Sequence, residues 1–153
     1  MDIVVNEWLL DYMRPDAEHP QKVLASKFVN AWVERCHKIL IRRPSPFVSK
    51  FYKYHKLFGW DQDFKERFKK INLLLFHNPD KTKILDDNDV TALPKELRSK
   101  THHKDIYLIE LAYCSADRIV VTTDEDLKKS LKDEGELRIY LPDEFLAEFS
   151  RQD

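Results

Sequence analysis

The stretch RIVVTTDEDLKK, residues 118–129, decides the fold prediction. Its beginning, RIVV, is apolar and β-branched, which is typical of a central strand in a parallel sheet. The segment that follows, DEDLKKSLKDEG, has the spacing of an amphipathic helix and places Gly135 at the expected C-cap. A buried strand therefore runs directly into a helix, and Asp124, Glu125 and Asp126 crowd the junction.

Strands and helices alternate along the rest of the chain. The segments DIVV, TKILDD and ELRIYLP predict further strands, whereas KILI fits either a helix end or a short strand. Helices are expected over residues 21–37, 46–58 and 61–76, with Asp61 as an N-cap, and over KDIYLIELAYCS and DEFLAEF. This order predicts a single α/β domain over residues 1–153: a three-layer α/β/α sandwich around a central, mainly parallel sheet.

Composition excludes several classes of protein. Hydrophobic residues make up 42% and charged residues 35% of the 153 residues, as in a globular domain. No apolar run approaches the roughly 18 residues of a membrane span, and the opening MDIVVNEW lacks the basic region of a secretory signal. Two glycines are too few for a Gly-rich phosphate loop. Cys36 and Cys114 form no CxxC pair, which favours reduced thiols in a cytoplasmic protein.

Acidic residues gather where the predicted strands end. In open parallel sheets, sites form beyond the carboxyl ends of the strands. Glu7 follows the first strand, Asp124 and Asp126 follow RIVV, and Asp105 begins the apolar helix that feeds that strand. Several carboxylates share a small site at neutral pH only if a positive charge joins them. Hard oxygen ligands suit Mg²⁺ or Mn²⁺, so we expect a divalent metal at these four acids. The alternative is that they are ordinary caps and first-turn acids of helices.

Neutral polar residues accompany these acids. Asn6 precedes Glu7, and Thr122 lies two residues before Asp124. We expect both side chains to orient the metal ligands without contacting the ion themselves.

Residues 35–60 form a basic, aromatic-rich window that contains no Asp or Glu. Cations can contact phosphates, and aromatic side chains can stack on unpaired bases, so Arg42, Arg43, Lys50 and Lys53 are candidates for RNA binding. Four aromatics of the window recur at helical spacing, which favours core packing instead. The seven cations are Arg35, Lys38, Arg42, Arg43, Lys50, Lys53 and Lys56, and the four aromatics are Phe47, Phe51, Tyr54 and Phe58.

Four segments together resemble the PIN-domain family of metal-dependent nucleases. They are NEWLLDYM after the first strand, KDIYLIELA with its leading Asp105, VVTTDEDL, and the tail LRIYLPDEFL. The resemblance implies a three-layer α/β/α fold, Mg²⁺ or Mn²⁺, and cleavage of RNA. It also implies that Asp105, Asp124 and Asp126 occupy acidic site positions, with Thr122 beside them.

The chain departs from the PIN pattern in two places. The family opens with an apolar strand followed by Asp, where this chain reads VVNEW and offers Glu7 as a substitute. The Glu that the family carries in the helix after the second strand has no match in the basic segment SPFVSKFYKYHKLFGW.

These features lead to two main hypotheses. The first is a cytoplasmic endoribonuclease, for which the toxin of a toxin–antitoxin pair is one role, with RNA as substrate and an antitoxin or other protein as regulator. The second is a catalytically degenerate PIN-like domain that binds RNA or a protein partner without cleavage. A domain that binds only an acidic protein is a third, and a homodimer stays open under each of them.

Overall fold

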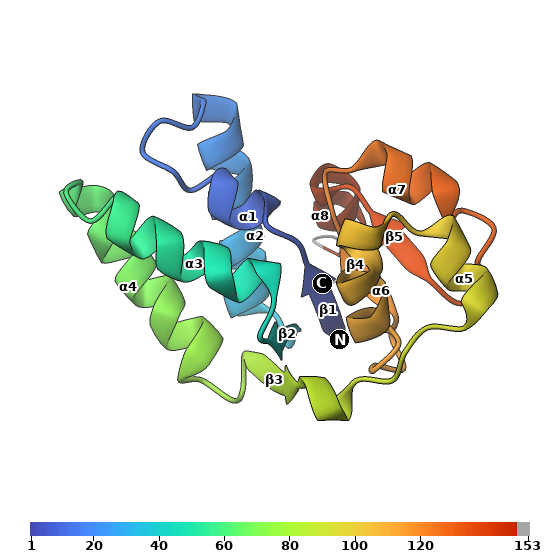
Figure 1. Cartoon of the computed structure of the whole chain (residues 1–153). Helices are drawn as coiled ribbons and strands as arrows, with labels where there is room; N and C mark the ends of the chain where they lie inside the picture. The colour runs from blue at the N-terminus through green and yellow to red at the C-terminus, as the bar shows by residue number, and fades with distance from the viewer. Residues whose placement is uncertain (150–153) are drawn as a thin grey trace.

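A five-stranded, all-parallel sheet forms the centre of the molecule (Figure 1). The computed structural model describes residues 1–149. The strands are ordered β3-β2-β1-β4-β5 across the sheet, so β1 lies in the middle, between β2 and β4. Their bounds are β1 (Asp2–Val5), β2 (Lys38–Arg43), β3 (Thr82–Asp86), β4 (Ile119–Val121) and β5 (Arg138–Tyr140).

Helices connect the strands and cover both faces of the sheet. Every connection between parallel strands must cross over a face of the sheet, and helices provide most of these crossovers. Within residues 1–149 the helices are α1 (Trp8–Asp11), α2 (His19–Glu34), α3 (Pro46–Leu57), α4 (Gln62–Phe76), α5 (Lys95–Lys100), α6 (Ile106–Ala112), α7 (Glu125–Ser130) and α8 (Pro142–Phe149). Two short 3-10 helices, η1 (Asp87–Asp89) and η2 (His103–Asp105), precede α5 and α6.

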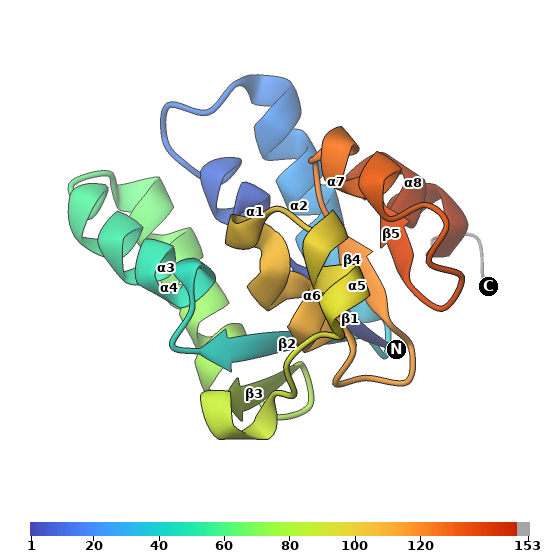
Figure 2. The same ribbon diagram turned by 45° about the vertical axis from the view of Figure 1, so that its right-hand side comes forward.

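The pleat of the strands divides the core into two layers. Successive side chains of a strand point to opposite faces, so Ile3 and Val5 of β1 pack with α1, α2, α3, α4 and α8. Val4, between them, packs with α5, α6 and α7 on the other face. Figure 2 shows α5 and α6 on the side of the sheet opposite to α3 and α4. The predicted three-layer α/β/α sandwich with a central parallel sheet is therefore confirmed.

Most of the predicted elements occur, with different ends. KILI belongs to strand β2, and the helix expected over residues 21–37 begins at His19 and ends at Glu34. Asp61 caps α4 as predicted, because its Oδ1 accepts a hydrogen bond from the backbone N–H of Phe64 at 2.9 Å. The prediction for Gly135 was wrong: α7 ends at Ser130, and its C-cap Leu131 has φ −113°, which requires no glycine.

An aromatic core joins α3 to α4. The four aromatics that were expected to face the core, Phe47, Phe51, Tyr54 and Phe58, are all buried. Phe51 stacks on Phe68 of α4 with ring centroids 4.7 Å apart and planes 7° apart. The aromatic residues of the basic window thus hold this helical hairpin together.

Two further findings concern membrane-spanning helices and the two cysteines. No helix among the described residues is long and apolar enough to cross a membrane. Cys36 and Cys114 are both free thiols, as the sequence predicted.

We predict that Phe68→Ala lowers the free energy of unfolding by about 3–5 kcal/mol, because it removes a fully buried ring and leaves a cavity between α3 and α4. Urea denaturation measures this change. Leu73→Ala is the control on the same helix: Leu73 is 53% exposed, and its loss should change stability by about 0.5 kcal/mol or less. Equal effects of the two substitutions would contradict the packing described here.

Candidate metal centre

A cleft of about 370 Å³ opens at the carboxyl ends of β1 and β4. From β1 the chain continues to β2 and β3 on one side of β1, and it later returns to form β4 and β5 on the other side. The strand order therefore reverses between β1 and β4. Ligands of open α/β sheets bind at such points. The cleft is lined by residues of α1 and of the segment just before α6, two helices that Figure 1 shows on either side of β1. Its lining consists of Asn6, Glu7, Trp8, Asp11, Pro46, Lys50, Lys104, Asp105, Thr123 and Asp124.

Glu7 enters the cleft from the turn between β1 and α1. It occupies the N-cap position of α1, yet its side chain makes no capping hydrogen bond. Instead, Glu7 Oε2 accepts a hydrogen bond from the Tyr107 hydroxyl at 3.0 Å. Burial, and then the negative charge of Glu7, raise the pKa of Tyr107, so its hydroxyl stays protonated and donates. Tyr107 therefore holds one oxygen of Glu7 against α6.

Asp105 enters from the opposite wall, at the N-cap of α6. The residue is buried, and its side chain does not cap the helix. Within the described part of the chain, no group donates a hydrogen bond to its carboxylate. Burial raises the pKa of Asp105 most, the charge of Asp124 next, and the charge of Glu7 less. Lys104 and His102 oppose that shift. Glu7 and Asp124 are thus close enough to Asp105 that the negative charge of each makes ionisation of Asp105 less favourable.

Asp124 is both a helix cap and a wall of the cleft. Its Oδ1 accepts a hydrogen bond from the backbone N–H of Leu127 at 3.0 Å, which caps α7. Behind it, the fully buried Thr122 Oγ1 accepts from Asn6 Nδ2 at 2.9 Å and from the backbone N–H of Asp124 at 3.1 Å. Asn6 and Thr122 thereby tie the loop after β4 to the loop after β1.

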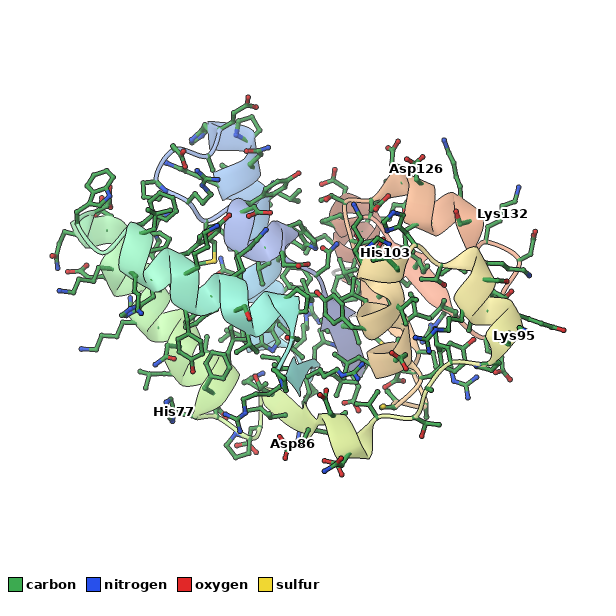
Figure 3. All side chains as sticks on the ribbon, in the orientation of Figure 1. His77, Asp86, Lys95, His103, Asp126 and Lys132 are labelled. Carbon is green, nitrogen blue, oxygen red and sulfur yellow. The ribbon has the colours of Figure 1, made fainter. Side chains whose placement is uncertain are left out.

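Asp126 does not join the other acids. The sequence predicted four carboxylates in one cluster, but Asp126 is exposed on the first turn of α7 and does not line the cleft. In Figure 3 its label stands on the outer side of α7. The physical reason is helical geometry: a residue two positions after the cap points about 200° around the axis, away from the side that the cap faces.

Two charged residues of the cleft were not predicted from the sequence. Asp11 lies four residues after Glu7 and therefore on the same face of α1, a spacing that was a usable signal. Its carboxylate accepts hydrogen bonds from Lys50 Nζ at 3.1 Å and from the Tyr54 hydroxyl. Burial, together with Asp11, raises the pKa of Tyr54 to about 12. Lys104, next to Asp105, is the second missed residue, and only the turn of η2 brings it to the cleft.

The four cations expected to bind RNA have different surroundings. Lys50 lines the cleft, while Arg43 and Lys53 are exposed. Arg42 requires a correction, because its guanidinium is engaged within the protein: it pairs with Asp87 at 2.8 Å and with the largely buried Glu110 at 3.3 Å. An arginine held by two carboxylates is not available to a phosphate, and both partners come from distant segments that the local sequence does not reveal.

The carboxylates of the cleft are suitable ligands for a divalent ion, but they are not placed closely enough to bind one. Three carboxylates from separate elements supply hard oxygen ligands and an excess of negative charge. Among residues 1–149, however, no three His, Cys, Asp or Glu side chains stand close enough together to hold a metal ion as they are placed. A metal ion would therefore require the three carboxylates to come closer together.

Comparisons with known proteins found nothing similar: no family model matches the chain, and searches of curated proteins and of solved structures gave no match. The resemblance to the PIN-domain family consequently stays a prediction. The geometry of the cleft is the main support for a function.

We predict that Asp105→Asn stabilises the protein at about pH 7. A raised pKa means that folding disfavours the ionised carboxylate, so the penalty is present above the folded pKa and absent below the ordinary Asp pKa of about 3.9. The melting temperature should rise by about 1–3 °C, since solvent screens part of the effect. The gain should shrink as the pH falls towards 4 and below, as thermal unfolding at several pH values would show.

Asp126→Asn is the matched control, because it removes the same charge from an exposed position outside the cleft. Its effect should stay within about 0.5 kcal/mol. A clear destabilisation by Asp105→Asn at neutral pH would show that Asp105 stabilises the fold and is not an unfavourable charge.

Proposed function

We propose that the protein is a divalent-metal-dependent endoribonuclease that hydrolyses RNA phosphodiester bonds in the cleft at the ends of β1 and β4. One observation carries the proposal: Asp105, a residue only 8% exposed, receives no side-chain hydrogen bond from the described residues and lies near the charges of Asp124 and Glu7. Such an arrangement is costly unless a cation relieves it. A divalent ion with open coordination positions for phosphate oxygens is the cation that suits these ligands.

The residues of the cleft take distinct roles in this proposal. Glu7, Asp105 and Asp124 would hold Mg²⁺ or Mn²⁺, which when bound supplies an activated water and neutralises charge on the phosphate. Tyr107 keeps one oxygen of Glu7 in place, and the Asn6–Thr122 hydrogen bond keeps the loop of Asp124 beside it. Lys104 is exposed at the rim, where its ammonium group would attract the substrate backbone.

Other parts of the proposal depend on the resemblance to PIN domains. RNA as the substrate, and an antitoxin or other regulatory protein as a partner, follow from that resemblance, as does a role as a toxin. A cytoplasmic location is proposed because both cysteines are free thiols.

A catalytically degenerate domain that binds RNA or a protein without cleavage is the second candidate. Two observations favour it. Lys50 and Lys104 line the same cleft as the acids. Among residues 1–149, no three potential metal ligands lie close enough together to hold an ion. A lysine ammonium group near the carboxylates would compensate their charge without a metal ion.

We predict that wild-type protein cleaves unstructured RNA with Mn²⁺ or Mg²⁺ but not with EDTA, and that Asp124→Asn lowers the rate by about 100-fold or more. Asparagine is as good an N-cap as aspartate, so this variant removes the charge and keeps the helix cap. Cleavage is measured on a labelled RNA by gel electrophoresis. Asp126→Asn, two residues further along α7, should cleave at close to the wild-type rate.

RNA binding that persists without any metal-dependent cleavage, and that Asp124→Asn leaves unchanged, would favour the degenerate domain. Cleavage that is equally fast in EDTA would contradict both candidates, because neither provides a metal-independent reaction.

We also predict that Mn²⁺ raises the melting temperature of the wild-type protein. An ion that binds only the folded state stabilises it by about 2.7 kcal/mol at 100 times its dissociation constant. Asp105→Asn should show a much smaller shift, because it removes one ligand and part of the negative charge. Differential scanning fluorimetry over a range of Mn²⁺ concentrations measures both, and identical shifts for the two proteins would exclude Asp105 as a ligand.

A further inference from the structure

Helix α3 has a buried face and a chemically distinct exposed face. Four of the exposed residues recur at positions i, i+1, i+4 and i+5 and so form a stripe along the second half of α3, and the exposed Trp60 follows in the turn before α4. We call these residues the α3 stripe: Tyr52, Lys53, Lys56, Leu57 and Trp60. The views of Figure 1 and Figure 2 both show α3 on the outside of the molecule, with α4 behind it.

The aromatic members of the α3 stripe are unusually exposed. Trp60 is 76% exposed and Tyr52 is 51% exposed, although large aromatic side chains generally bury most of their surface. Tyr52 stacks against Phe76 of α4, with planes 18° apart and centroids 6.0 Å apart, so its ring is held in a defined orientation. Trp60 makes no ring contact within the described residues. These two rings offer flat surfaces for a planar ligand group.

The cations of the α3 stripe are free to bind an anion. Lys53 and Lys56 are exposed, and neither forms an ion pair in the part of the chain that the structure describes. Their segment, residues 35–60, contains no Asp or Glu. The lack of an ion pair within the described residues distinguishes Lys53 and Lys56 from Arg42, which two carboxylates engage.

The α3 stripe continues into the candidate metal centre. Lys50 lies one turn before Lys53 on α3 and lines the cleft that contains Glu7, Asp105 and Asp124. From Lys50 to Leu57, at the end of α3, the helix rises about 10 Å, and Trp60 lies in the turn beyond it. A chain-like anion that lies along the stripe would therefore reach the carboxylates at one end.

We infer that the α3 stripe binds single-stranded RNA and directs it into the cleft, an inference that rests on the proposed function and adds the substrate class and its path. Lysines contact the phosphates, and unpaired bases stack on Tyr52 and Trp60. A duplex has its bases stacked on one another and offers none to the two rings. An acidic peptide would pair with the lysines but has no regular planar groups for the aromatic side chains.

The first test measures binding of a fluorescent oligouridylate of about ten nucleotides by anisotropy, with EDTA present so that no cleavage occurs. Trp60→Ala and Tyr52→Ala should each weaken binding by about fivefold or more, the loss of one stacked base. Leu73→Ala on α4 is the control, since it removes an apolar side chain that is also about half exposed. Unchanged affinity in both aromatic variants would overturn the inference.

The second test separates the role of the cations from that of the aromatic rings. Replacing Lys53 and Lys56 by Gln should make the salt dependence of binding shallower, by about 0.7 in the log–log slope for each phosphate that a lysine no longer neutralises. The control replaces Lys129 and Lys132 of the α7 region, which are also exposed. Figure 3 labels Lys132 on the side of the molecule opposite to α3. An equal change of slope in the control would overturn a specific path along α3.

Two comparisons identify rival occupants. Duplex RNA of the same length should bind more weakly than the oligouridylate and should not respond to Trp60→Ala. A polyglutamate peptide should compete poorly. Equal binding of duplex RNA, or effective competition by polyglutamate with the same response to Trp60→Ala, would replace single-stranded RNA by another ligand and overturn the inference.

Binding of RNA along α3 and cleavage of RNA in the cleft can be tested separately. A dinucleotide is too short to extend from the cleft along the α3 stripe, so its cleavage should be lost in Asp124→Asn and retained in the control Leu73→Ala. If the oligouridylate binds along α3 but no RNA is cleaved, the inference stands and the nuclease activity fails. If the dinucleotide is cleaved while Tyr52 and Trp60 have no effect on binding, the nuclease stands and the path along α3 fails.

Discussion

The parallel pairing of β1 with β4 is the constraint on which the candidate centre depends. Ile3, Val4 and Val5 pair in register with Ile119, Val120 and Val121, so the two strands end side by side. Trp8 Nε1 donates a hydrogen bond to the carbonyl oxygen of Val121 at 3.0 Å, which attaches α1 to the end of β4. The next residues of each strand then meet in the Asn6–Thr122 hydrogen bond. A shift of this register by one residue would turn the buried side chains to the wrong face and separate the acids.

The charges of the cleft are organised by helix geometry and by nearby cations. Asp124 uses one oxygen for the cap of α7, whereas Asp105 begins α6 without such a bond and carries an unfavourable charge. Asp11 is engaged by Lys50 and Tyr54. The fold therefore neutralises some of its acids and leaves Asp105 uncompensated by any direct hydrogen bond among the described residues. Sites that bind ligands often retain such locally unfavourable groups.

Helix α3 shows how one segment serves both stability and recognition. Phe51 and Tyr54 fill the core between α3 and α4, while Tyr52 and Lys53, their immediate neighbours, face outwards. The same segment is therefore aromatic for two reasons. The buried rings remove apolar surface from water. The exposed rings are not explained by core packing, and they lie beside lysines that form no ion pair within residues 1–149.

The sequence by itself determined the class of fold, the strand RIVV, and which aromatic side chains of α3 face the core. These features depend on the local periodicity of apolar residues. It also placed acids at strand ends, since parallel strands end at one edge of the sheet. Only the tertiary structure decided which groups share the cleft. Asp126 turns away, Arg42 is engaged by Asp87 and Glu110, and Asp11 and Lys104 join. Side-chain direction and partners distant in sequence decide these outcomes, and neither is a property of the local pattern.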